Sequence, residues 1–262
     1  MANEKRRGFA LGDIWLGGPE LNLIAGPCAL ESEADLEEVA ASLQRLGQRL
    51  LRAGVCKPRT SPRSYQGQGL EGLAILSRVA HKYGLYCVSE LTDLAHLEAY
   101  LEHVDIIQVG ARSMQYFPLL RALGRVDKPV LLKRGFGNTV EELLGAADYI
   151  LEGGNRRLIL CERGIRSFET ATRATLDLGA VALLKQRCSL PIFVDPSHAA
   201  GRADLVEPLA LAALAAGADG LLLELHPDPK RALSDPQQQL DLPAFEGLVR
   251  RVRRLTDCLR DF

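Results

Sequence analysis

Eight apolar runs alternate with helical stretches along this chain, and that alternation constrains its fold more than any other feature. The runs are rich in leucine and β-branched residues and lie at 21–26, 49–54, 84–90, 104–110, 129–135, 157–162, 191–197 and 220–225. Nearly continuous apolar runs are typical of parallel strands buried on both faces. Amphipathic helical stretches lie between them at 33–48, 69–83, 139–152, 170–187, 204–217 and 243–259. Strict alternation of this kind predicts a parallel sheet with helices outside it.

Eight repeats favour closure of the sheet into a barrel over an open doubly wound sheet. Such barrels take about 250 residues as a single domain, and the chain has 262. We therefore predict an α/β fold, a (β/α)8 TIM barrel over residues 21–262, with residues 1–20 as an N-terminal segment that caps it. No GxGxxG follows an apolar run directly, and no GxxxxGK[ST] appears in the sequence, so the usual glycine-rich phosphate loops are missing. Any bound phosphate would therefore be held by side chains.

Residues suited to binding an anion or a metal lie at or just past the ends of these runs. They are Cys28, Arg52, Lys57, Glu90, Arg112, Lys133, Arg163, His198 and Glu224. The strand ends of a (β/α)8 barrel converge on one face, where active sites are built. The sequence therefore predicts a single polar pocket on that face.

The pocket should be cationic although the chain as a whole is not. The formal net charge is -1, which argues against nucleic acid or a membrane as partner and favours a small anion. Five cations lie at or just past strand ends, at Arg52, Lys57, Arg112, Lys133 and Arg163. So dense a cluster is costly unless anions occupy it. The alternative is that individual members are ordinary surface cations.

A loop rich in cations and hydroxyls follows the second run. It reads KPRTSPRSYQGQG and brings Lys57, Arg59, Thr60 and Ser61 close together, with two prolines that restrict its backbone. Loops on this face of a barrel usually carry substrate contacts, so we interpret it as an anion clamp. A polar surface loop is the alternative.

Four residues are candidate metal ligands. Cys28, His198 and Glu224 follow the first, seventh and eighth runs, which are neighbours in a closed barrel, and Asp235 lies in the loop beyond. One thiolate, one imidazole and two carboxylates can bind a divalent transition ion, but the mixed set selects neither zinc, manganese nor iron. Asp195 could orient the imidazole of His198. Taken singly, Cys28 could be a core residue and His198 part of a capped helix start.

Several motifs together resemble one enzyme family over about residues 20–260. They are IAGPC, KPRTSPRSYQGQG, QVGAR, LLKRG, CERG, VDPSHAAGR, LELHPDP and LSDPQQ. The chain resembles the type I beta 3-deoxy-D-arabino-heptulosonate 7-phosphate (DAHP) synthases, in their short form without a regulatory domain. Such enzymes condense phosphoenolpyruvate with erythrose 4-phosphate and release phosphate, the first step of the shikimate pathway.

The resemblance implies specific roles. Arg112 and Arg163 would hold the phosphate of phosphoenolpyruvate, and Arg52, Lys57 and Lys133 its carboxylate and bridging oxygen. The sugar phosphate would bind Arg59, Thr60 and Ser61. The implied ligands of one divalent ion (Mn, Fe, Co or Zn) are Cys28, His198, Glu224 and Asp235. Glu90 would position the attacking water, and Lys57 is our candidate for proton delivery to the aldehyde oxygen.

Two rival functions remain. The sister enzyme makes 3-deoxy-D-manno-octulosonate 8-phosphate from arabinose 5-phosphate, but its clamp typically reads KANRSS where this chain has KPRTSP. A non-catalytic anion-binding partner would be favoured by loss of a metal ligand, and none is lost. We expect a homotetramer or homodimer, with a separate chorismate mutase as a possible regulatory partner. Six cysteines without a CxxC pair fit a reducing, cytoplasmic location.

Overall fold

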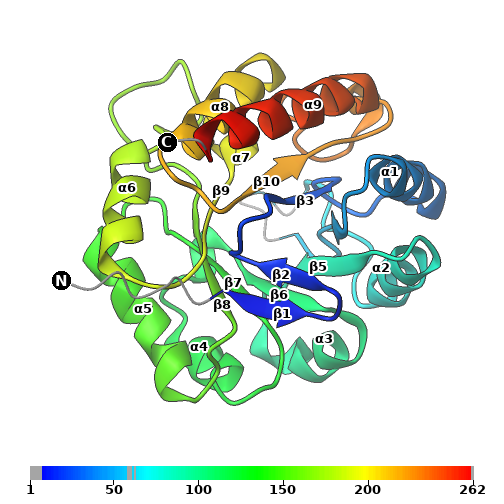
Figure 1. The fold of residues 1–262 in the computed structure, drawn as a ribbon. Coiled ribbons are helices and arrows are strands. Elements are labelled where there is room, and N and C mark those ends of the chain that lie inside the picture. The colour runs from blue at the N-terminus through cyan, green and yellow to red at the C-terminus, as the bar shows by residue number, and fades with distance from the viewer. Residues whose placement is uncertain (1–7, 58–60, 62, 261–262) are drawn as a thin grey trace.

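The computed structural model describes residues 8–57, 61 and 63–260. Within them, parallel strands form a closed barrel in the order β10-β3-β4-β5-β6-β7-β8-β9 (Figure 1). The strands are β3 (Asn22–Gly26), β4 (Leu50–Arg52), β5 (Tyr86–Glu90), β6 (Ile106–Val109), β7 (Val130–Lys133), β8 (Leu158–Glu162), β9 (Ile192–Val194) and β10 (Gly220–Glu224). Each lies within one of the eight apolar runs, so the predicted (β/α)8 barrel is confirmed.

Helices surround the barrel on the outside (Figure 1). They are α1 (Glu33–Arg45), α2 (Glu71–Lys82), α3 (Leu97–His103), α4 (Phe117–Leu123), α5 (Val140–Glu152), α6 (Leu178–Arg187), α7 (Pro196–Ala200), α8 (Val206–Ala215) and α9 (Leu242–Leu259), with short 3-10 turns η1 (Leu94–His96), η2 (Ala111–Ser113), η3 (Ala203–Leu205) and η4 (Pro229–Arg231). Polar side chains fix several starts: Ser32 caps α1, and Thr139 forms a capping box with Glu142 at α5.

The predicted helical stretch 170–187 is wrong in its first half. The helix α6 begins only at Leu178, where the Asp177 side chain accepts a hydrogen bond from the backbone of Ala180. Residues 170–177 instead belong to a long loop between β8 and α6. The backbone N–H groups of Arg173 and Ala174 donate to Ala200 and Ala199, at 3.1 and 2.9 Å. These contacts hold the loop against α7.

The pleat of the strands places an apolar layer inside the barrel. Its members are Ile24, Leu50, Val88, Ile106, Leu131, Ile159, Phe193 and Leu222. Because side chains alternate across a strand, a residue two positions further along points the same way. Those positions hold Gly26, Arg52, Glu90, Gln108, Lys133, Cys161, Asp195 and Glu224, most of which are polar. A polar layer therefore lies directly above the apolar one, at the carboxyl ends of the strands.

A hairpin precedes the barrel. The strands β1 (Phe9–Leu11) and β2 (Ile14–Leu16) pair antiparallel, and Phe9 and Leu16 join the inner apolar layer. The Asp13 carboxylate accepts a hydrogen bond of 2.7 Å from Tyr86, which begins β5. The hairpin thus contacts the amino ends of the strands. The division into a cap over 1–20 and a barrel over 21–262 stays a prediction.

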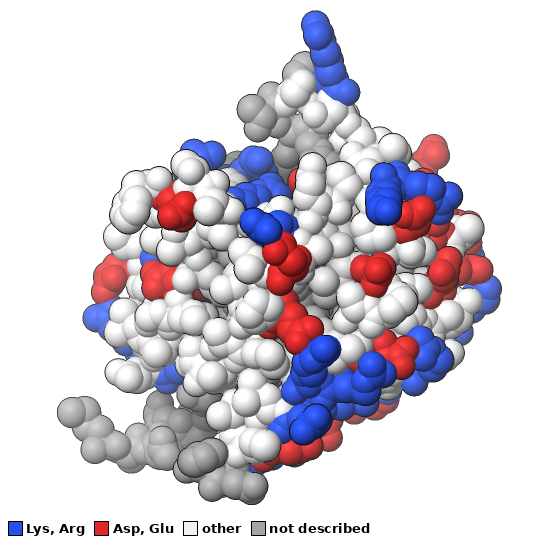
Figure 2. Space-filling view, turned by 90° about the horizontal axis from the view of Figure 1, so that it is seen from above, with Lys and Arg blue, Asp and Glu red and all other residues white. Residues whose placement is uncertain are grey.

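The basic run near the end of the chain lies on an exposed face of α9. Its arginines Arg250, Arg251, Arg253 and Arg254 are exposed, and Figure 2 shows lysine and arginine gathered in a band with acidic residues beside it. Arg250 and Arg251 pair with Glu246 and Glu207 at 2.9 and 3.0 Å. These contacts place the basic run on a solvated face of the helix. Among the described residues, no helix is long and apolar enough to cross a membrane.

Candidate active site

One pocket opens above the polar layer, at the carboxyl ends of the strands. It is lined by Lys57, Glu90, Gly110, Ala111, Arg112, Lys133, Phe136, Arg163, Arg173, His198 and Asp235. Seven residues predicted from the sequence are therefore brought together. Arg52 lies buried below them, and Ser61 is exposed in the clamp loop. Arg59 and Thr60 fall outside the described residues.

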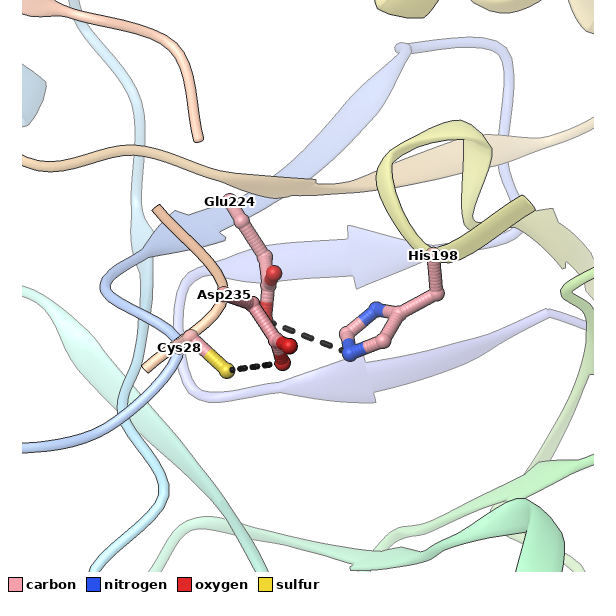
Figure 3. A group of neighbouring side chains, drawn as sticks. All are labelled: Cys28, His198, Glu224 and Asp235. Atoms are coloured by element: carbon pink, nitrogen blue, oxygen red, sulfur yellow. Dashed lines mark hydrogen bonds and ion pairs between the residues drawn. The ribbon is translucent and has the colours of Figure 1, made fainter. Parts of the chain in front are cut away.

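The four candidate metal ligands converge at one edge of this pocket. Each offers one ligand atom, and these atoms all lie within 4.8 Å of one another. Cys28 Sγ is 3.1 Å from Asp235 Oδ2, and His198 Nε2 is 3.3 Å from Glu224 Oε1 (Figure 3). A thiol, an imidazole and two carboxylates, mostly shielded from water, match the donors that divalent transition ions take. The geometry fits such an ion.

Asp195 fixes the ring of His198. Asp195 Oδ2 lies 2.7 Å from His198 Nδ1, and its Oδ1 accepts from the His198 backbone N–H at 2.9 Å. Burial lowers the pKa of His198 even though Asp195 and Glu224 oppose this shift. A neutral ring with its proton on Nδ1 presents the lone pair of Nε2 to the cluster. This is how carboxylates orient metal-binding imidazoles.

Glu224 is a buried carboxylate held by charged and polar neighbours. Its Oε1 accepts from the Arg52 guanidinium and its Oε2 from the Gln238 amide. Burial opposes ionisation, but the electrostatic interactions with His198 and Arg52 outweigh burial and hold the pKa of Glu224 well below its usual value. The side chain is therefore an anion at neutral pH and available as a ligand.

The pKa of the Cys28 thiol is shifted upward, in contrast to that of Glu224. Burial, together with the negative charge of Glu224, raises the pKa of Cys28 to about 12. Lys57 Nζ lies 3.1 Å from its sulfur and Ser234 Oγ lies 2.9 Å from it. Lys57 also donates to the Cys28 carbonyl at 2.9 Å. The one lysine thus contacts both the pocket and a candidate metal ligand.

Two pocket arginines share an aromatic ring. The guanidinium carbons of Arg112 and Arg163 lie 5.4 and 4.8 Å from the centre of the Phe136 ring. Such stacking favours a cation and limits its movement. Burial lowers the pKa of Arg163, although Asp195 opposes the shift. Two guanidinium groups beside one ring, with Arg163 buried and Arg112 exposed, suit an oxyanion such as phosphate.

Glu90 reaches the pocket because its neighbour is a glycine. Glu90 Oε2 accepts from Gln108 Nε2 at 3.1 Å. A β-carbon built on Gly110 would lie 1.9 Å from Glu90 Oε1, far inside van der Waals contact. A side chain at position 110 would therefore displace the carboxylate.

The sequence of residues 3–260 matches the family described as DAHP synthetase I. The chain belongs to the DAHP synthetase I family. It is 51% identical to the phospho-2-dehydro-3-deoxyheptonate aldolase of Thermotoga maritima, over 95% of this chain and 74% of that protein. A crystal structure of the Thermotoga DAHP synthase superposes with a TM-score of 0.95 at 50% identity, covering 98% of this chain and 75% of the other.

More distant relatives in this comparison carry the sister activity in their names. The 2-dehydro-3-deoxyphosphooctonate aldolase of Syntrophotalea carbinolica is 35% identical over 88% of this chain and 89% of its own length. The sequence is thus much more similar to the Thermotoga DAHP synthase.

The structure adds site residues to those predicted for this DAHP synthetase I chain. Phe136 follows β7 in the motif LLKRGF. Its position just past a strand end could have indicated from the sequence that it lines the pocket. No sequence signal placed Arg173 in the site, because it lies in the stretch 170–187 that was predicted to be helical. Gln238 and Gln239 contact Glu224 and the backbone of Cys28, but neutral amides beyond the last strand carry no mark of function.

Proposed function

We propose that this protein is a DAHP synthase, which condenses phosphoenolpyruvate with erythrose 4-phosphate and water to give DAHP and phosphate. The observation that carries the proposal is the four-donor cluster of Cys28, His198, Glu224 and Asp235 beside a pocket lined by cations. The 51% identity with the Thermotoga enzyme supports it.

The pocket cations would bind and align the two anionic substrates. Arg112 and Arg163 would hold the phosphate of phosphoenolpyruvate, and Lys57 and Lys133 would meet its carboxylate and bridging oxygen. Arg52, which is buried beneath the pocket beside Glu224, would contribute its positive charge to binding the same carboxylate and bridging oxygen. Alignment of substrates that otherwise repel each other can contribute about 7 to 11 kcal/mol of the rate enhancement.

The clamp loop would bind the sugar phosphate. We assign this role to Arg59, Thr60 and Ser61, of which only Ser61 is among the described residues. Lys57 begins the same loop and lies against Cys28, so it would stand between the two substrates.

The cluster would hold one divalent ion, which can be Mn, Fe, Co or Zn. When bound, that ion would act as a Lewis acid toward the aldehyde oxygen. The methylene carbon of phosphoenolpyruvate attacks the aldehyde carbon, and Lys57 delivers a proton to the aldehyde oxygen. Glu90 positions the water that adds to the carbon bearing the phosphate. The resulting tetrahedral intermediate collapses and phosphate leaves.

The sister reaction with arabinose 5-phosphate is the second candidate, favoured only by relatives at 35% identity or less. The clamp sequence KPRTSP argues for erythrose 4-phosphate. Parallel assays with both aldose phosphates, with the product identified by mass, test the choice. A seven-carbon product supports this proposal, and an eight-carbon product supports the sister enzyme. No product from either sugar supports a non-catalytic anion-binding partner.

The remaining proposals concern partners and location. We propose a homotetramer or homodimer, a separate chorismate mutase as a possible regulatory partner, and a cytoplasmic location. They rest on the family resemblance and on six cysteines without a CxxC pair.

A further inference from the structure

We propose that Arg173 is a positioning residue that orients both carboxylates of the metal cluster. Its Nη1 lies 3.4 Å from Asp235 Oδ1. The same nitrogen donates to Gln238 Oε1 at 2.8 Å, and Gln238 in turn donates to Glu224 Oε2. One guanidinium therefore contacts one carboxylate directly and the other through an amide. This inference rests on the metal site of the proposed function.

The two oxygens of each carboxylate are divided between these contacts and the cluster. In Asp235, Oδ1 faces Arg173 and Oδ2 lies 3.1 Å from Cys28 Sγ. In Glu224, Oε2 accepts from Gln238 and Oε1 lies 3.3 Å from His198 Nε2. Holding one oxygen of a carboxylate fixes the direction of the other. Partners of this kind orient metal ligands in proteins.

The backbone around Arg173 is fixed from the side of His198. Arg173 and Ala174 donate backbone hydrogen bonds to Ala200 and Ala199 of α7, the helix that carries His198. The residue after that helix, Gly201, has a φ of +70°, and a β-carbon there would lie 2.5 Å from Cβ of Arg173. Glycine at this position thus permits the close approach of the loop. Arg173 connects the loop, α7 and the segment that carries Asp235.

The backbone conformation of Asp235 explains why its orientation depends on contacts from other residues. With a φ of +50°, it is the one non-glycine residue in the left-handed region within the described part of the chain. Aspartate tolerates this region better than most residues, yet the conformation persists only where neighbours determine it. Arg173 and Cys28 contact the two oxygens of its side chain. Loss of Arg173 should therefore allow the Asp235 carboxylate to turn.

Two physical effects of Arg173 oppose each other. Its positive charge repels a divalent cation, so its removal would strengthen metal binding if charge dominated. Its hydrogen bonds orient two ligands, so its removal would weaken binding if positioning dominated. The direction of the change in metal affinity therefore decides between them.

The test is a titration of the metal-stripped protein with Co²⁺, followed by the absorption band of the cobalt–thiolate bond to Cys28. We expect Arg173→Met to raise the dissociation constant about tenfold or more, and Gln238→Leu to raise it in the same direction. In the double variant the dissociation constant should rise by less than the product of the two single-variant increases, because both residues belong to one chain of contacts. Arg173→Lys should fall between wild type and Arg173→Met, because lysine can still donate a hydrogen bond although it lacks the planar fork.

The matched control is Arg166→Met, which removes an equal charge from the same loop. Arg166 stacks on Phe136 at 5.1 Å and should leave the Co²⁺ dissociation constant within about twofold. Circular dichroism and the thermal midpoint establish that each variant is folded. Should Arg173→Met not fold, Gln238→Leu carries the same test.

Unchanged or tighter Co²⁺ binding by the folded Arg173 and Gln238 variants overturns the inference and leaves the metal site intact. A wild-type protein that shows no cobalt–thiolate band overturns the inference together with the proposed metal site. The two failures are therefore distinguishable.

Discussion

Lys133 and His198 are held by the same atom, Oδ2 of Asp195. Lys133 Nζ lies 2.5 Å from it and His198 Nδ1 lies 2.7 Å from it, and Asp195 is fully buried. Burial opposes ionisation, but the electrostatic interactions with His198 and Lys133 outweigh it and hold the pKa of Asp195 well below its usual value. One carboxylate thus fixes both a pocket cation and an imidazole of the metal cluster.

Asp195→Asn should impair metal binding and stability together. The variant leaves buried Lys133 without its counter-charge, and breaking such a pair costs about 3 to 5 kcal/mol of unfolding free energy. His198 also loses the charged acceptor that orients it, so Co²⁺ affinity should fall about 10- to 100-fold. Urea unfolding and Co²⁺ titration measure the two effects.

The matched control for that variant is Asp219→Asn. Asp219 forms a buried pair with Lys185 away from the pocket, so its loss should also lower the unfolding free energy. Co²⁺ affinity should stay unchanged. Equal losses of metal affinity in both variants would show that Asp195 acts only through stability.

Gly110→Ala should abolish most turnover while the fold persists. The added methyl would lie 1.9 Å from Glu90 Oε1, and the carboxylate must move to admit it. Gly145→Ala is the control, because a β-carbon at that position in α5 meets nothing within 4 Å. That control should gain about 0.5 to 1 kcal/mol of stability. Normal turnover of Gly110→Ala would remove Glu90 from the mechanism.

Lys57→Ala should reduce turnover about 10²- to 10⁴-fold, the usual contribution of general acid–base catalysis. Lys57 also lies against the sulfur of Cys28, so the metal content of the same sample must be measured. A large loss of turnover with the metal retained supports proton delivery by this lysine. Near-normal turnover contradicts it.

Metal binding should release one proton from Cys28. Burial, with the charge of Glu224, raises the pKa of the thiol to about 12, so the thiol carries its proton at neutral pH, whereas metals bind the thiolate. Burial lowers the pKa of His198, so that ring is already neutral and contributes none. Apparent affinity should then rise about tenfold per pH unit near neutrality.

Calorimetry in two buffers with different ionisation enthalpies measures that proton. Cys28→Ser is the comparison, because serine keeps its hydroxyl proton and the variant should release none. Metal binding by the wild-type protein without proton release would exclude Cys28 thiolate as a ligand.

The barrel and most of the pocket were predictable because their signals are local. Each apolar run specifies a strand, and the residue at its end, such as Lys133 or Glu224, is placed by the pleat alone. Convergence on one face then follows from the parallel topology. The polar layer could therefore be predicted from the sequence alone.

The ion pairs that those residues form could not be predicted from the sequence. That Arg52 would pair with Glu224 and Lys133 with Asp195 depends on side chains from strands distant in the sequence. Arg173 was assigned to a helix because the segment before Leu178 shares the composition of a helical stretch. Its actual conformation is set by hydrogen bonds to residues 199 and 200, which no local pattern reveals.

The most direct test of the central claim is phosphoenolpyruvate consumption by metal-stripped protein, with and without restored Mn²⁺. Erythrose 4-phosphate and arabinose 5-phosphate are supplied in parallel. We predict turnover that requires both the metal and erythrose 4-phosphate. Preference for arabinose 5-phosphate, or no turnover with either sugar, would contradict the assignment as a DAHP synthase.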